Sequence, residues 1–147
     1  MTDNEALIKA FKICLNAHRG QVDKVGEDYC LHPITVMVNL THSTNDEKIV
    51  ALLHDVVEDS GWTMADLVRE GFSADVLIAV AVLTRTSNFS YSEYIQGVAR
   101  YPIAVKVKIA DLEHNMDTSR LQHRSPKDDV RLIRYAEAMR FLKKEVR

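Results

Sequence analysis

Apolar residues recur three and four positions apart along most of this 147-residue chain, which is the spacing of one face of an α-helix. The first such stretch carries Leu7, Phe11 and Cys14 and follows the cap residues 2–4. Glycine occurs only 5 times and proline 3 times, too few for the many turns of an all-β protein. The sequence therefore predicts an all-α protein, in which residues 1–147 form a single compact bundle of about seven to nine helices.

Cap residues and prolines indicate where the later helices begin. One helix is expected to run without a break from Glu47 to Glu58. The segment 74–83 is apolar on nearly all sides, so we expect it at the centre of the bundle. The last helix begins at Ser125-Pro126 and is expected to direct these residues inward: Val130, Ile133, Ala136, Met139 and Leu142.

Charge and cysteine content exclude several classes of protein. The formal net charge is −2 and the basic residues are scattered among acids, so no field suited to a nucleic-acid backbone is expected. The longest apolar run, 76–83, is too short to cross a bilayer, and the N-terminus does not have the pattern of a signal peptide. Cys14 and Cys30 form no paired motif, which favours reduced thiols and a cytoplasmic location.

Four ionisable residues lie close together beside a hydrophobic run at 52–59, namely His54, Asp55, Glu58 and Asp59. The core of a helix rarely carries so many charges without a functional reason. Two further segments supply His32, which begins a helix before a proline, and Asp111, which shares a helical face with Asn115.

Together His32, His54, Asp55 and Asp111 are candidate ligands for one divalent ion such as Mn²⁺, Fe²⁺, Co²⁺ or Zn²⁺. An ion with two open positions could bind a water and a substrate oxygen. Glu58 and Asp59, one helical turn further on, are placed to orient or deprotonate the attacking water.

Each residue also has a simpler interpretation. A His-Asp dipeptide can be a surface pair, His32 can be a helix cap, and Glu58 with Asp59 can be solvated acids. Asp111 could be the buried partner of Lys108 or Arg120. The ordered conjunction of a histidine, a His-Asp pair and a distant aspartate favours the metal site.

The order His32, His54-Asp55, Asp111 is similar to that of the HD phosphohydrolase superfamily. Three longer strings resemble the hydrolase domain of the RelA/SpoT-type alarmone enzymes and the small alarmone hydrolases: AHRGQVDKVGEDYCLHP, ALLHDVVEDS and VKIADLEHNMDT. The resemblance extends over roughly residues 17–121 and implies a helical bundle of the HD type.

The resemblance implies a specific reaction, the removal of the 3′-pyrophosphate of (p)ppGpp with Mn²⁺ as cofactor. It makes His32, His54, Asp55 and Asp111 the metal ligands and Glu58 with Asp59 the water-activating pair. Water would attack the 3′-phosphorus, and pyrophosphate would be released. The substrate-binding residues implied are these: Lys24, Asn115 and Thr118. The partner is a small-molecule nucleotide, and neither nucleic acid nor membrane is expected.

The chain departs from the family pattern at Asp23, where the bifunctional members carry an arginine that packs on guanine, and at Leu112 and Asp117, where those members often have basic residues. Another nucleotide, such as a nucleoside monophosphate, NADPH or an adenine alarmone, is therefore an alternative substrate. A catalytically silent metal-binding module is a third hypothesis. The sequence does not define the oligomeric state.

Four other residues have weaker signals. His18 could hydrogen-bond a ligand carboxylate, whereas His114 is expected to point away from the site. Arg85 follows an apolar helix and could point into a cleft. Tyr91 could stack on a base, although aromatic residues at helical spacing are more often in the core.

Overall fold

The computed structural model describes residues 1–119 and 121–146, and this part contains α-helices, one short 3₁₀ helix and no strand. An isolated β-bridge joins Val22 to Asp28 in the loop after the first helix. The prediction of an all-α protein is confirmed. The elements, in chain order, are α1 (Asp3–Ala17), α2 (Leu31–Asn39), α3 (Asn45–Leu53), α4 (Val56–Asp59), α5 (Met64–Arg69), α6 (Ala74–Leu83), α7 (Tyr91–Val98), α8 (Pro102–Asn115), α9 (Pro126–Lys143) and η1 (Lys144–Val146).

Reciprocal caps set the starts of α1, α3, α5, α7 and α9. In each, a Ser or Thr side chain accepts from a backbone N–H three residues on, and the acid at that position accepts from the cap's own N–H. In α7 the cap is Ser90. Because these bonds join residues only three apart, sequence alone predicts the helix starts well.

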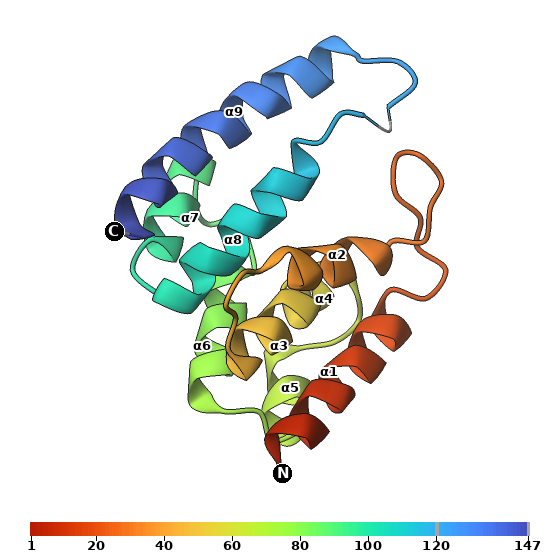
Figure 1. The fold of residues 1–147 in the computed structure, drawn as a ribbon, viewed down its shortest axis with the longest axis vertical. Coiled ribbons are helices and arrows are strands. Elements are labelled where there is room, and N and C mark those ends of the chain that lie inside the picture. The colour runs from red at the N-terminus through yellow and green to blue at the C-terminus, as the bar shows by residue number, and fades with distance from the viewer. Residues whose placement is uncertain (120, 147) are drawn as a thin grey trace.

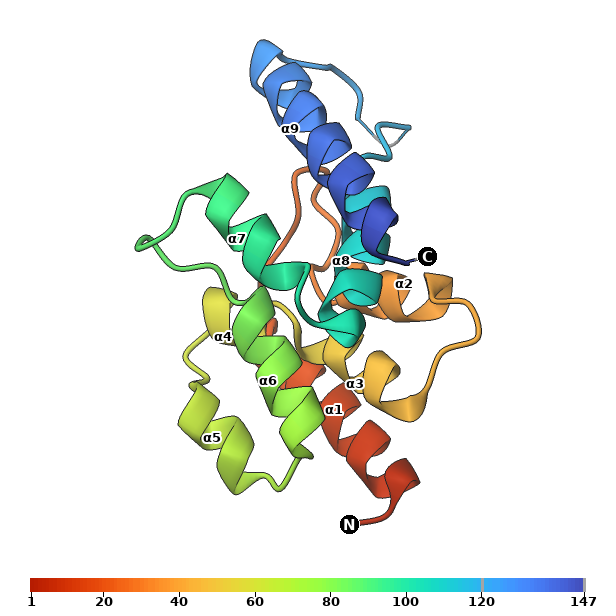
Figure 2. The ribbon, with the colours of Figure 1, turned by 90° about the vertical axis from the view of Figure 1, so that its left-hand side faces the viewer.

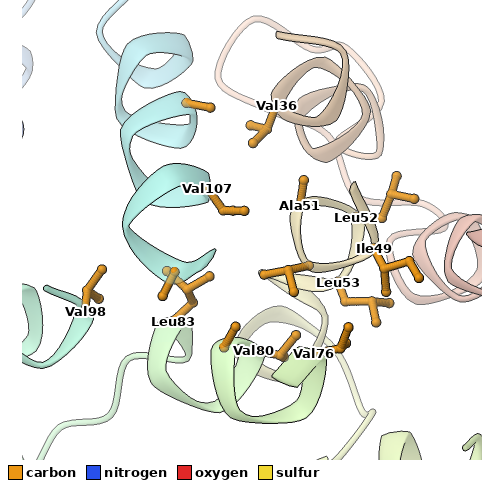
Figure 3. Packing of buried hydrophobic residues seen from close by; sticks show 14 of the residues in the cluster. Val36, Ile49, Ala51, Leu52, Leu53, Val76, Val80, Leu83, Val98 and Val107 are labelled. Carbon is orange, nitrogen blue, oxygen red and sulfur yellow. The ribbon is translucent and has the colours of Figure 1, made fainter. Parts of the chain in front are cut away.

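The central helix of the bundle is α3, which contacts α1, α2, α6 and α8. Figure 3 shows its side chains Leu52 and Leu53 among those of the surrounding helices, and both are completely buried. The prediction that 74–83 lies at the centre is wrong. Helix α6 packs one face on α3 and leaves Ile78 46% exposed on the other.

Helix α9 buries only its C-terminal half. Met139 and Leu142 are in the core, whereas Val130 is 68% and Ile133 62% exposed, contrary to the prediction that both point inward. Ala136 is half-buried. Figures 1 and 2 show the reason: the first turns of α9 extend beyond the rest of the bundle, so no element covers them.

The segment expected as one helix from 47 to 58 is two helices, α3 and α4, with a break at His54-Asp55. Asp55 has φ −105° and ψ −2°, outside regular α-helix geometry. Adjacent side chains on a continuous helix point about 100° apart. The break allows two neighbouring residues to direct their side chains to one point. No helix in residues 1–119 or 121–146 combines the length and apolarity needed to span a bilayer.

Candidate metal centre

Three elements bring the four candidate ligands together. His32 comes from the first turn of α2, His54 and Asp55 from the break after α3, and Asp111 from α8. His32 Nε2 lies 2.8 Å from Asp111 Oδ1 and 3.7 Å from Asp55 Oδ2. His54 Nε2 lies 3.1 Å from Asp55 Oδ2 and 3.4 Å from Asp111 Oδ1. The side chains of His32, His54 and Asp111 are buried, and that of Asp55 is 16% exposed.

The hydrogen bond on the far side of His54 determines what the ring presents to this cluster. His54 Nδ1 lies 2.6 Å from the carbonyl oxygen of Ala51, so this nitrogen donates its N–H there. In the neutral ring, Nε2 then carries a lone pair. This atom is buried, has no hydrogen-bond partner among the described residues, and faces the carboxylates of Asp55 and Asp111. A lone pair directed at two carboxylates is unfavourable unless a cation lies between them, so the residues fit a divalent metal ion.

Both aspartates are held in the charged form that a metal ligand requires. Burial alone would raise the pKa of Asp55, but the neighbouring His54 outweighs this and lowers it to about 2. Burial also opposes ionisation of Asp111, yet the ammonium group of Lys108 holds its pKa well below the usual range. In the protein without metal, these carboxylates raise the pKa of His54 despite its burial.

A second histidine supports His32 from outside the cluster. The Nδ1 atoms of His32 and His114 are 2.7 Å apart, and the rings stack with centroids 5.0 Å apart and planes 18° apart. The expectation that His114 points away from the site is therefore wrong. The sequence signal was its position three residues after Asp111, which places both side chains on neighbouring turns of α8.

Asp55 has a supporting partner that the sequence analysis missed. Tyr29 donates its hydroxyl to Asp55 Oδ2 at 2.6 Å. The bond expected of His18 does not form with a ligand carboxylate: its Nδ1 pairs with Gln21 Oε1 at 2.9 Å, and its ring contacts Tyr29. The tyrosine lies at the end of the loop between α1 and α2, where its ring contacts those of His18 and His32.

Asp111 is held from two sides. Lys108 Nζ lies 2.8 Å from Oδ2, and the amide of Asn115 donates to Oδ1 at 3.1 Å. The simpler interpretation of Asp111 as an ion-pair partner of Lys108 is thus also correct, because one carboxylate oxygen pairs with the lysine while the other faces the histidines. Arg120, the other partner considered, lies outside the described residues.

Glu58 and Asp59 lie beside this cluster on α4. One carboxylate oxygen from each of Asp55, Glu58 and Asp59 lies within 4.8 Å of the others. Burial raises the pKa of Glu58 and of Asp59, which makes each a better proton acceptor than a fully solvated acid. Glu58 Oε1 accepts from the backbone N–H of Arg85 at 2.7 Å, and this bond holds it against the start of the α6–α7 loop.

A cavity of about 360 Å³ opens from His32 toward α9. Of the three residues expected to bind substrate, Lys24 and Asn115 line this cavity, whereas Thr118 lies on a separate hollow with Met116. Lys24 also pairs with Asp128 at 3.2 Å. The other lining residues are Val22, Asp23, Val25, Tyr29, His114, Asp117, Leu121, Arg131 and Tyr135.

Two residues not expected at the site, Arg131 and Tyr135, bring a cation and an aromatic ring from α9 to this cavity. Their spacing of four residues places them on one face of the helix, which is the only signal that could have indicated them.

Comparisons with known proteins support the same interpretation as the geometry of the site. No family model matches the chain. It is 32% identical over 146 residues to a GTP pyrophosphokinase of Myxococcus xanthus, which covers 88% of this chain and 19% of that protein. It is 31% identical over 119 residues to a guanosine-3′,5′-bis(diphosphate) 3′-pyrophosphohydrolase of Haemophilus influenzae, covering 72% and 17%. The chain thus spans less than a fifth of the length of these relatives.

A solved structure superimposes on almost the whole chain. It is described as a metazoan ortholog of SpoT that hydrolyzes ppGpp, and it matches with a TM-score of 0.75 and 23% identity over 96% of this chain and 91% of its own. The helical bundle with a buried His, His-Asp, Asp cluster defines an HD-type domain. The chain is thus similar in sequence to a stretch of these relatives and in fold to the SpoT ortholog, which supports an HD-type domain of the RelA/SpoT kind.

Proposed function

We propose that this chain is a metal-dependent phosphohydrolase that removes the 3′-pyrophosphate of guanosine 3′,5′-bis(diphosphate), ppGpp. The observation that carries the proposal is that His54 Nε2, which has no hydrogen-bond partner among the described residues, faces two ionised aspartates beside a pair of acids with raised pKa values. The names of the relatives and of the structural neighbour support the reaction and the nucleotide.

In this proposal His32, His54, Asp55 and Asp111 hold the ion, and Mn²⁺ suits a set of two imidazoles and two carboxylates. A bound divalent ion supplies Lewis acidity toward a phosphoryl oxygen and lowers the pKa of a bound water. The acids have a separate role. Glu58 and Asp59 orient the water and take its proton as its oxygen bonds to the 3′-phosphorus. The P–O3′ bond breaks, O3′ takes up a proton and remains on the nucleotide as a hydroxyl, and pyrophosphate is released.

The cavity contains groups that can bind the nucleotide. Lys24 and Arg131 offer cations to phosphate oxygens, Asn115 offers an amide, and Tyr135 offers a ring to the base. We assign Thr118 no contact, because it does not line this cavity. We also propose that residues 1–147 act as one hydrolase domain, in the cytoplasm, where free thiols such as Cys14 and Cys30 are kept reduced.

One observation favours a second substrate. Asp23 lines the cavity and brings a negative charge close to where a polyanionic nucleotide would bind. A nucleotide with fewer charges on that side, such as a nucleoside monophosphate or NADPH, would be repelled less. An adenine alarmone carries the same phosphates as ppGpp, so the charge of Asp23 does not distinguish the two.

The test is to incubate the Mn²⁺-loaded protein with ppGpp, nucleoside monophosphates and NADPH and to identify the products by ³¹P NMR. Pyrophosphate from ppGpp supports the proposal, and orthophosphate released from another nucleotide supports the second candidate. If all substrates survive while the metal is bound, the domain is catalytically silent.

Two variants distinguish the metal ligands from the water-activating acids. Glu58→Ala should retain the metal and lose turnover, whereas Asp55→Ala should lose the metal itself. Glu113→Ala, which removes an exposed acid from α8, is the matched control and should change neither.

A further inference from the structure

Two arginines that the proposed reaction does not use lie on Tyr91, the first residue of α7. The guanidinium carbon of Arg134, from α9, is 4.4 Å from the centroid of the Tyr91 ring, and that of Arg85, from the α6–α7 loop, is 5.2 Å from it. Helices α7 and α9 contact each other, and Figure 2 shows the α6–α7 loop leading into α7. Three segments that are separate in sequence thus bring two positive charges to one ring.

Neither arginine is neutralised by a neighbour in the structure as described. In residues 1–119 and 121–146, no carboxylate forms a salt bridge with Arg85 or Arg134, and both side chains are exposed. Glu137 lies in the same groove between α7 and α9, but beyond ion-pair distance of Arg134. Stacking on an aromatic ring orients a guanidinium and leaves its N–H donors available to an anion.

Two chains of contacts join this pair of arginines to the metal centre. On one side, the backbone N–H of Arg85 donates to Glu58, one of the water-activating acids. On the other side, the ring centroids of Tyr91 and Tyr94 are 5.9 Å apart. The ammonium nitrogen of Lys108 lies 5.3 Å from the ring centroid of Tyr94. Lys108 in turn pairs with the ligand Asp111. Arg85 therefore adjoins the site next to α4, and Arg134 lies beside it on the ring of Tyr91.

We propose that Arg85 and Arg134 form an anion subsite for the distal phosphate of a diphosphate group whose proximal phosphate is at the metal centre. This rests on the proposed function, since it adds to that site a preference for a diphosphate over a single phosphate. The distal phosphate carries most of the charge of a diphosphate, and the cations assigned above, Lys24 and Arg131, line the cavity beside His32 and not this edge of the site. Planar guanidinium groups match phosphate oxygens in charge and geometry.

The test uses inorganic pyrophosphate and orthophosphate as probes, titrated calorimetrically into the Mn²⁺-loaded full chain. Arg134→Gln should weaken pyrophosphate binding about tenfold, because a charge-assisted pair is lost, and should change orthophosphate binding less than about twofold. Arg140→Gln removes another exposed arginine from the same helix and is the matched control. It should leave both affinities unchanged.

Arg85→Gln, on a different element, repeats the test should the α9 variant not fold, and the double variant should bind pyrophosphate no better than orthophosphate. Unchanged pyrophosphate affinity in these variants overturns the subsite, as does an equal loss for orthophosphate or for Arg140→Gln. Hydrolysis of the nucleotides is measured separately from the binding of pyrophosphate. If no nucleotide is hydrolysed but pyrophosphate binding depends on the arginines, the reaction fails and the subsite stands. Hydrolysis of ppGpp with arginine-independent pyrophosphate binding rejects the subsite alone.

Discussion

The Nδ1 atoms of His32 and His114 lie 2.7 Å apart, so one ring must donate a proton to the other. If His32 offers the lone pair of Nε2 to a metal, its Nδ1 carries the N–H, and His114 accepts it. The second histidine thereby sets the tautomer and the orientation of the first. Partners of this kind influence metal affinity without touching the metal.

We predict that His114→Ala lowers the affinity for Mn²⁺ by about 10- to 100-fold, because His32 loses the acceptor that fixes its tautomer. Competition with a chelator of known affinity measures the change. His123→Ala, which removes an exposed histidine from the loop before α9, should have no effect. Equal affinities for the two variants would show that the stacked pair does not support the ligand.

Tyr29→Phe should weaken metal binding about three- to tenfold, since Asp55 loses a short hydrogen bond that orients Oδ2. The ring remains, so its contact with His18 is preserved and the fold should be unaffected. Calorimetric titration with Mn²⁺ gives the affinity. The comparison is Tyr101→Phe, a half-exposed tyrosine at the start of α8, and a loss of the same size there would refute the assignment.

Metal affinity should increase as the pH rises above about 6.5, the ordinary pKa of a histidine. The pKa of His54 is raised in the protein without metal, where Asp55 and Asp111 stabilise its protonated form. Below that pKa the metal must displace a proton from Nε2, and as the pH rises the competing proton is lost. Titrations in two buffers of different ionisation enthalpy should therefore show proton release on binding. A constant affinity with no proton release would contradict the idea that His54 is a ligand.

Asp23 has a structural role as well as a charge. Its Oδ1 accepts from the backbone N–H groups of Val25 and Glu27, which holds the loop 23–27 in a tight turn. Asp23→Asn keeps an acceptor oxygen and removes the charge, so a polyanionic nucleotide such as ppGpp should bind about two- to threefold more tightly, with a smaller gain at high salt.

The comparison for this prediction is Asp28→Asn, which removes a charge from the same loop outside the cavity. Binding of ppGpp to both variants can be followed by calorimetry with Glu58→Ala as background to prevent turnover. If Asp28→Asn gives the same gain, the effect is one of net charge and Asp23 does not select the nucleotide.

Helix positions could be read from the sequence because their causes are local. The caps at Thr44 and Ser90 bond to residues three positions away. Pro102 and Pro126 occupy the first position of their helices, where a proline is favoured because no backbone N–H is needed there. The exposure of Val130 and Ile133 could not be read in this way, because a helical face is buried only if another element reaches it.

The same distinction between local and long-range causes applies to the candidate site. The sequence by itself determined which residue types are present and in what order, and His32, His54, Asp55 and Asp111 do converge. Only the tertiary structure decided the break after α3, the support from Tyr29 and His114, and the pair of arginines on Tyr91. The reason is the separation of the partners along the chain. A cap depends on neighbours within one turn, whereas these contacts join helices whose relative positions are set by the packing of the whole core around α3.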